Sequence, residues 1–68
     1  MLLGNNLKRI RKKNKLGIRE LERISGVSHN IIINIESGKS KNPTIISIIK
    51  LAEALEVTID ELIYGYKK

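Results

Sequence analysis

The basic side chains of this sequence are concentrated in its first half, where they could bind a polyanion. The 68 residues carry 13 Lys and Arg against 7 Asp and Glu, a formal net charge of +6. Residues 1–34 hold eight basic and two acidic residues, whereas residues 35–68 hold five of each. A one-sided basic surface attracts polyanions such as nucleic acid. Basic residues also solvate exposed helices, so the charge alone leaves both interpretations open.

No residue set typical of an enzyme or a metal site accompanies these charges. With no Cys and one His, disulfides and thiolate or multi-histidine metal sites are excluded, and we expect no metal and no cofactor. Glu20, Glu22 and Glu36 are explained by helix ends and ion pairing, so we expect no enzymatic activity. No apolar run approaches the roughly 20 residues of a membrane span and no signal peptide is apparent. The expected location is therefore the cytoplasm, at the nucleoid.

The apolar residues recur at helical spacing and predict an all-α protein, with residues 1–68 forming one domain. Strand signals are poor, because no Asn-Gly or Asp-Gly hairpin turn occurs. In the second helix, Leu21 and Ile24 are expected to point inward. The predicted helices span residues 3–14, 18–25, 28–37, 44–55 and 58–64.

Helix-capping residues support these boundaries. Ser28 and Thr44 precede helical patterns and suit N-caps, because their hydroxyls accept from unpaired amides. Thr58 and Glu61 have the spacing of a capping box, in which each side chain satisfies one backbone N–H of the first turn. Gly17 can cap the second helix. The local signals therefore fix where most helices begin.

The second and third predicted helices are separated by Gly26 and Val27 alone. A glycine-containing turn of this length sets two helices at a steep angle, so the second can project from the surface. A projecting helix fits the major groove of DNA. Helical hairpins of no function have similar sequences, so this turn needs further support.

Residues of matching type and spacing run through nearly the whole chain. They are Leu7-x-x-Ile10-Arg11, Leu16, Arg19-Glu20-Leu21, Ser25-Gly26-Val27-Ser28, Ile32, Ile35-Glu36-x-Gly38-Lys39, Asn42-Pro43-Thr44 and Leu51-Ala52-x-Ala54-Leu55-x-Val57. From about residue 3 to residue 63, this pattern resembles the Cro and lambda-repressor type (XRE-like) of helix-turn-helix DNA-binding domain. The resemblance implies a compact five-helix lambda-repressor-like bundle that binds operator DNA, usually as a two-fold dimer.

In proteins that this chain resembles, the start and outer face of the third helix read bases. The corresponding residues are His29, Asn30, Ile31 and Asn34. An Asn amide can bond adenine N6 and N7 together, and Ile31 could contact a thymine methyl group. His29 could donate to guanine or to a phosphate. We therefore expect these four side chains to carry sequence recognition, the alternative being ordinary solvated helix surface.

The resemblance also implies contacts to the DNA backbone. At the start of the third helix, Ser28 and the unpaired amides suit a phosphate. At the start of the second helix, Ile18 stands where the family often has Gln. Only the backbone N–H of Ile18 can therefore bond to a phosphate. The polar loop after the third helix would approach the backbone, setting register without reading sequence. Its residues are Lys39, Ser40, Lys41 and Asn42.

Arg11 and Glu36 occupy positions that form a structural ion pair in the resembling proteins, so we expect Arg11 to hold the fold together rather than to bind DNA. Two departures from the family pattern bear on the structure. Glu22 replaces a small Ala between the two helices, so either its carboxylate leans out, towards Arg19 or Arg23, or the angle between the helices opens. Glu56 replaces a Gly at a helix end, where a left-handed conformation costs a non-Gly residue about 1 kcal/mol.

The fourth and fifth helices carry the residues expected to join two copies of the chain. This side often forms the dimer in the resembling proteins, which sets the reading helices about 34 Å apart to match half-sites one DNA turn apart. Leu62 is expected to belong to the core of the monomer instead. The predicted interface residues are Ile45, Ile46, Ile63, Tyr64 and Tyr66.

Together these features predict a transcriptional regulator, more often a repressor, whose dimer reads a palindromic operator in double-stranded DNA. The alternative is a protein-interaction module of the same fold, antitoxin-like or antirepressor-binding, with weak or no specific DNA binding. Apolar residues on the outer surface, such as Ile33 and Ile46, favour this alternative. Salt separates the two, because phosphate contacts weaken steeply as salt rises and apolar contacts do not.

Overall fold

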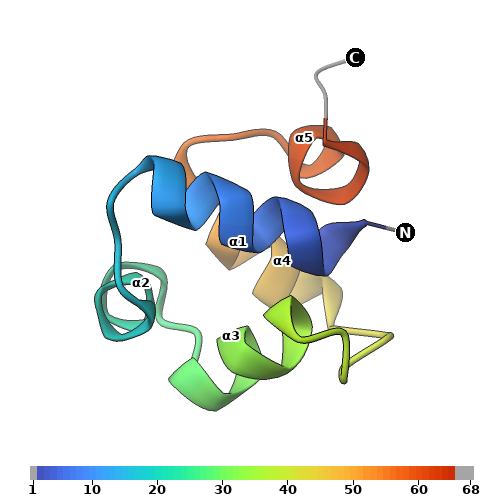
Figure 1. Ribbon diagram of the computed structural model, residues 1–68, viewed down its shortest axis with the longest axis horizontal. Coiled ribbons are helices and arrows are strands. Elements are labelled where there is room, and N and C mark those ends of the chain that lie inside the picture. The colour runs from blue at the N-terminus through green and yellow to red at the C-terminus, as the bar shows by residue number, and fades with distance from the viewer. Residues whose placement is uncertain (1, 66–68) are drawn as a thin grey trace.

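The computed structural model describes residues 2–65 and forms five α-helices (Figure 1). They are α1 (Leu3–Lys13), α2 (Ile18–Ser25), α3 (His29–Glu36), α4 (Ile45–Leu55) and α5 (Ile59–Tyr64). The predicted all-α, five-helix architecture is confirmed. Among residues 2–65, no helix has both the length and the apolar character needed to cross a bilayer.

Capping side chains start three of the helices as predicted. Ser28 Oγ accepts from Ile31 N–H at 3.3 Å, and Thr44 Oγ1 accepts from Ser47 N–H at 3.1 Å. Thr58 Oγ1 accepts from Glu61 N–H at 3.0 Å, while the Glu61 carboxylate accepts from Thr58 N–H at 3.1 Å. The capping box is confirmed. Each cap residue lies just before its helix, which is why α3, α4 and α5 begin one residue later than predicted.

The helices surround one apolar core. The first helix, α1, packs against α3 and α5, while α2 packs against α3 and α4. In Figure 1, α1 lies across the middle of the molecule, with α5 above it and α3 below. Every helix contributes at least one side chain that is almost completely buried. These residues are Leu7, Leu21, Ile32, Ile35, Leu51 and Leu62. Leu62 therefore belongs to the core, as expected.

Ile24 does not point inward, and that prediction is wrong. Its side chain is 44% exposed, whereas Leu21 is fully buried. The inward stripe of α2 runs through Leu21 with the half-buried Ile18 and Ser25, and Ile24 lies beside it. Val27, in the turn that follows, is 4% exposed and belongs to the core. Three-residue spacing alone left the orientation of this short helix undetermined.

Two residues of α1 allow neighbouring helices to approach closely. Gly4 lies against the carbonyl oxygen of Ile35, and a Cβ at this position would overlap that oxygen. The buried Asn6 side chain donates to the carbonyl oxygens of Leu62 and Ile63 at 3.1 and 3.3 Å. Because these carbonyls belong to the last turn of α5, which lacks intrahelical donors, Asn6 satisfies them and fastens α5 to α1.

Two non-glycine residues after helices adopt the left-handed conformation. Glu56, at the end of α4, has φ 56° and ψ 41°, which confirms the strained backbone expected there. Lys15, after α1, has φ 58°. At these positions Cβ crowds the following carbonyl group, which destabilises the folded chain.

Candidate nucleic-acid interface

A three-residue turn between α2 and α3 sets the angle of the projecting helix. Gly26 takes the left-handed conformation with φ 77°, and its N–H donates to the carbonyl of Glu22. Glycine adopts this conformation without steric cost, so α2 ends sharply there. The buried Val27 then anchors the turn to the core, and Ser28 starts α3. Local chemistry therefore builds the predicted helix-turn-helix.

The outer face of α3 presents a mixture of amide and apolar groups. Ile32 and Ile35 face the core, which leaves the other side of α3 to solvent. On that side Asn30 and Ile31 are exposed, and Asn34 is half-buried. Three of the four predicted base-reading residues thus lie along one accessible helix face. Amide groups of this kind can bond to base edges, and an aliphatic side chain can contact a methyl group.

The first turn of α3 is joined to α2 by Glu22. One oxygen of its carboxylate, Oε2, accepts from the backbone N–H of His29 at 2.9 Å and lies 3.0 Å from His29 Nδ1. Arg19 is more distant, with 4.0 Å between its Nη1 and Glu22 Oε1. The expectation that Glu22 leans towards Arg19 or Arg23 therefore missed its main partner. The hydrogen bonds from His29 lower the pKa of Glu22, because they stabilise the charged carboxylate.

This contact changes what the start of α3 offers to a phosphate. The N–H of His29 is already occupied by a carboxylate, and the N–H of Ile31 donates to Ser28 Oγ. The Ser28 hydroxyl retains its own proton and is exposed, so it can still donate to a phosphate oxygen. His29 is held on the α2 side of the helix start, whereas Asn30 and Ile31 are exposed.

The loop after α3 folds back onto the end of that helix. The N–H of Ser40 donates to the carbonyl of Asn34 at 2.9 Å, so Ser40 is half-buried. Lys39, Lys41 and Asn42 remain exposed beside it. A cation-rich loop at this position could contact the DNA backbone while α3 lies in the groove.

Lys8 lines a shallow groove beside the end of α3. This groove has a volume of about 190 Å³ and is lined by Lys8 of α1, Ile18 of α2, and Ile33 and Ser37 near the end of α3, together with Glu36. Ile18 is half-buried, and its N–H belongs to the first turn of α2, where amides lack intrahelical acceptors. Sequence reasoning missed Lys8 as a candidate contact. The basic first half of the chain indicated that cations such as Lys8 could bind DNA. It did not indicate on which face of the fold each cation lies.

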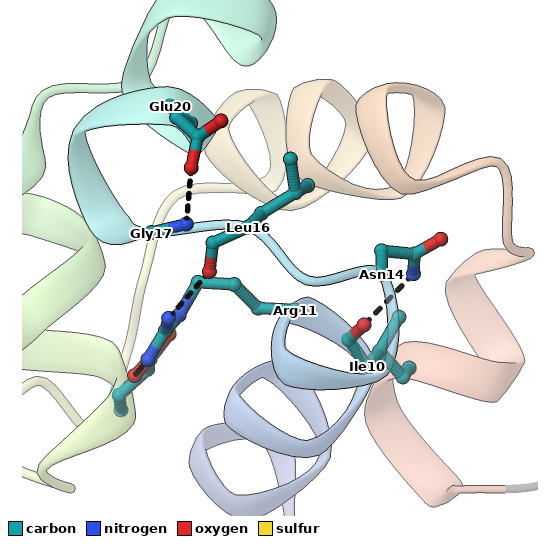
Figure 2. Close-up of polar contacts among 7 residues, drawn as sticks. Ile10, Arg11, Asn14, Leu16, Gly17 and Glu20 are labelled. Carbon is teal, nitrogen blue, oxygen red and sulfur yellow. Dashed lines mark hydrogen bonds and ion pairs between the residues drawn. The ribbon is translucent and has the colours of Figure 1, made fainter.

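Arg11 joins three segments at the other end of α3. Its Nε and Nη2 donate to the two carboxylate oxygens of Glu36 at 2.7 and 2.9 Å. Its Nη1 donates to the carbonyl of Leu16 at 2.8 Å, in the connection between α1 and α2 (Figure 2). The Arg11 and Glu36 side chains are only 9% and 7% exposed, and their hydrogen bonds raise the pKa of Arg11. The Arg11 guanidinium is thus directed into the fold and not towards solvent.

The start of α2 is held by a separate contact in the same region. Glu20 accepts from the N–H of Gly17 at 2.9 Å, so Gly17 acts as the N-cap, as predicted (Figure 2). Asn14 donates to the carbonyl of Ile10 at the end of α1. These local bonds fix the connection that positions α2, and through α2 the projecting helix.

Comparison with known proteins agrees with this geometry. A sequence profile described as a helix-turn-helix domain matches residues 4–68. The chain belongs to this helix-turn-helix family. A protein of Sinorhizobium fredii that is named an uncharacterized HTH-type transcriptional regulator, y4dJ, is 39% identical over 62 residues, which cover 91% of this chain and 79% of that protein. The N-terminal DNA binding domain of SinR from Bacillus subtilis superposes with a TM-score of 0.87 at 27% identity, over 98% of this chain and 94% of that chain.

A second relative is longer than this helix-turn-helix chain. The HTH-type transcriptional repressor RghR of Bacillus subtilis is 42% identical over 65 residues, which cover 93% of this chain. The match spans 48% of RghR, about half of its length.

The basic residues of the helix-turn-helix chain do not all face the same way as α3. Arg9 and Lys13 line a hollow of about 390 Å³ at the junction of α4 and α5, together with Glu56 and Glu61. Arg9 and Lys13 therefore lie beside carboxylates, in a hollow different from the groove that contains Lys8. Among the basic residues of α1, Lys8 thus borders the end of α3, whereas Arg9 and Lys13 border α4 and α5.

Most of the predicted dimer residues lie on the surface of the helix-turn-helix fold. Ile45 and Ile46, at the start of α4, are 59% and 62% exposed, and Tyr64 is 49% exposed. Ile63 is half-buried. Tyr66 lies outside the described residues. Sequence reasoning missed Ile49, which is 38% exposed and one turn after Ile45 on α4.

Within residues 2–65, no group of three or more His, Asp or Glu side chains is arranged to hold a metal ion. Glu20 and Glu61 instead bond to the N-cap amides of α2 and α5, and Glu36 and Glu22 pair with Arg11 and His29.

Proposed function

We propose that this chain binds double-stranded DNA sequence-specifically and regulates transcription, as a repressor more than an activator. The observation that carries the proposal is the accessible face of α3, with Asn30 and Ile31 exposed and Asn34 beside them. The family relationship supports it, because two relatives are named as a transcriptional regulator and a transcriptional repressor. Residues 1–68 would then act as one DNA-binding domain, located with the nucleoid in the cytoplasm.

In this proposal α3 lies in the major groove, where His29, Asn30, Ile31 and Asn34 contact base edges. Contacts with the sugar–phosphate backbone flank it on both sides. Ser28 and the N–H of Ile18 contribute from the helix starts, and Lys8 from the adjacent groove. The polar loop contributes the rest through Lys39, Ser40, Lys41 and Asn42. These contacts would orient α3, and their cations would release counterions from DNA.

We further propose that two copies of the chain associate through the α4–α5 side. Support comes from the exposed Ile45 and Ile46, with Ile49 on the same helix and Ile63 and Tyr64 on α5. Large aliphatic side chains gathered on one helix of a small protein are costly to leave in water. A two-fold dimer would present two α3 helices to the half-sites of a palindromic operator.

The decisive experiment is selection of bound sites from random duplex DNA. The proposal predicts enrichment of a palindromic consensus with half-sites about one DNA turn apart. Affinity for the selected site should fall steeply with salt, because several phosphates are neutralised. Recovery of random sequences, or of a consensus without internal symmetry, would contradict specific or dimeric binding respectively.

Sedimentation tests the dimer directly. The variant Ile46→Glu places a charge in the proposed interface and should shift wild-type dimers to monomers. Ile24→Glu is the matched control, because Ile24 is exposed on α2, which lies outside the proposed interface. A wild-type protein that stays monomeric even on selected DNA would contradict the proposal.

A protein-interaction module is the second candidate, and the exposed isoleucines favour it. Ile24, Ile31 and Ile33 add to those of α4, so apolar residues occur on several faces of the described chain. A protein partner that covers these residues would bind with little salt dependence. Ile33→Glu would weaken the complex with that partner. Its effect on DNA affinity would be limited to the repulsion between the new carboxylate and the phosphates.

A further inference from the structure

His29 makes two contacts with one carboxylate oxygen, and together these contacts determine where its ring carries a proton. Glu22 Oε2 lies 2.9 Å from the backbone nitrogen of His29 and 3.0 Å from its ring atom Nδ1. The two side chains are 32% and 28% exposed, so they are partly shielded from competing water. The contact crosses the turn and connects α2 to the first residue of α3.

The chemistry of the oxygen decides the direction of the second contact. A backbone N–H can only donate, so Oε2 already acts as an acceptor for His29. The carboxylate sits at the positive end of α3 and has a lowered pKa, so it is ionised and has no proton to give. The ring atom that faces it must therefore be the donor, Nδ1–H.

The other ring nitrogen is available to a ligand. In residues 2–65, no side-chain nitrogen or oxygen is both buried and without a hydrogen-bond partner. Nε2 of His29 makes no hydrogen bond among these residues, so it reaches solvent at the start of α3. In a neutral ring whose Nδ1 carries the proton, Nε2 carries a lone pair and can only accept.

We propose that Glu22 is a positioning residue that fixes neutral His29 as the Nδ1–H tautomer and presents Nε2 to DNA as an acceptor. The role in DNA reading rests on the proposed function, whereas the role in fixing the tautomer does not. In the major groove, the hydrogen-bond donors on base edges are adenine N6 and cytosine N4. Neutral His29 therefore selects a base with an exocyclic amino group. Donation from His29 to guanine, as expected from the sequence, requires the doubly protonated ring.

The tautomer can be measured without DNA. The sequence contains one His, so nitrogen-15 spectra of the imidazole ring in tag-free protein report His29 alone. At a pH where the ring is neutral, wild-type protein should show a protonated Nδ1 and an unprotonated Nε2. Glu22→Gln keeps an acceptor oxygen and should keep this pattern, whereas Glu22→Ala should shift the proton mainly to Nε2.

Glu20→Gln is the matched control for charge, because Glu20 lies on the same helix and bonds to Gly17 instead. It should leave the His29 spectrum unchanged. A wild-type spectrum with the proton on Nε2, or one that Glu22→Ala does not alter in a folded protein, would overturn the proposal.

The DNA arm uses site selection with the same variants. One position of each half-site should prefer adenine or cytosine on the strand that faces His29. Glu22→Ala and His29→Ala should both reduce that preference about fivefold, as expected for one hydrogen bond, while Glu20→Gln keeps it. A preference that survives Glu22→Ala would overturn the reading role. If wild-type protein selects no sequence at all, the proposed function fails, and the spectra alone decide the role of Glu22.

Discussion

The two ends of α3 are attached to the rest of the protein by charged contacts of different kinds. At the C-terminal end, Arg11 and Glu36 form a two-bond ion pair whose side chains are 9% and 7% exposed. At the N-terminal end, Glu22 and His29 meet through one carboxylate oxygen, with side chains about a third exposed. The first contact is nearly closed to solvent, and the second is open to it.

This difference separates support from recognition. A buried pair that loses one partner leaves an uncompensated charge, so its members are costly to change. A half-exposed contact costs less to change, because water replaces the missing partner. The exposed amide and apolar residues of α3 lie between the two ends. We infer that the Arg11 end fixes the direction of the helix, whereas the Glu22 end adjusts what the helix presents.

The largest effect is expected when the closed contact is broken. Glu36→Ala leaves Arg11 charged and nearly buried, with the carbonyl of Leu16 as its remaining acceptor among the residues bonded to it here. We expect the free energy of unfolding to fall by about 3 kcal/mol, at the lower end of values for buried pairs. For a chain of this size, that loss is comparable to the whole stability of about 3–5 kcal/mol.

Chemical denaturation followed by circular dichroism measures this loss. Glu53→Ala is the control, because it removes the same charge from a residue that is exposed on α4. An equal unfolding midpoint for Glu36→Ala and Glu53→Ala would show that the Arg11 pair contributes nothing, and the contrast between the two ends would disappear.

On the face of α3 between its two ends, a substitution should change DNA binding and leave stability nearly unchanged. Asn34→Ala removes an amide and leaves the backbone carbonyl that holds Ser40, so stability should change little. Binding to a selected operator should weaken about tenfold, near the lower limit for a base contact, while binding to random DNA stays the same. Equal losses on both DNAs in a fluorescence titration would remove Asn34 from the base-reading set.

Lys41→Ala gives the complementary result. Lys41 is exposed in the loop after α3 and is proposed to contact phosphate. Its removal should weaken all DNA alike and make the salt slope shallower by about one. A loss confined to one sequence would instead assign Lys41 to base reading.

Local chemistry explains which parts of this structure the sequence predicts well. The starts of α3, α4 and α5 follow from Ser28, Thr44 and Thr58, because each cap oxygen and the backbone N–H that donates to it lie within three residues of each other. The strained Glu56 was predicted in another way, because it stands where the resembling proteins have Gly at a helix end. Such features need no knowledge of how the helices pack.

The resemblance supplied the Arg11–Glu36 pair, but other contacts that depend on packing were missed. Asn6 meets the carbonyls of Leu62 and Ile63, 56 and 57 residues away, and only the docking of α5 on α1 creates that contact. The meeting of Glu22 with His29 depends on the angle of the turn, and the face of Lys8 depends on the position of α1. Their residue types showed that they could form polar contacts, but the sequence alone could not identify the partners.

A smaller effect on stability is expected at Glu56, after α4. It provides a reference for the changes at the two ends of α3. Glu56→Gly relieves the left-handed strain after α4 and should raise the free energy of unfolding by about 1 kcal/mol. Glu56→Ala, which removes the carboxylate but keeps Cβ, should not stabilise the protein. The base preference should be the same in Glu56→Gly and wild type. A changed preference would mean that stability and recognition are coupled throughout the fold, and that the two ends of α3 are not distinct.

The smallest effect is expected at the open end, and pH reveals it. Because His29 lowers the pKa of Glu22 in the folded protein, the contact stabilises the fold at pH values above the usual carboxyl pKa of 4.5. This stabilisation is lost as the pH falls through the lower, folded-state pKa, since the carboxyl group then becomes protonated in both states. The difference in Tm between wild type and Glu22→Gln should therefore be present at neutral pH and vanish in acid. A difference that persists unchanged in acid would mean that the charge of Glu22 plays no part at this end of α3, and that hydrogen bonds to an uncharged side chain are enough to orient His29.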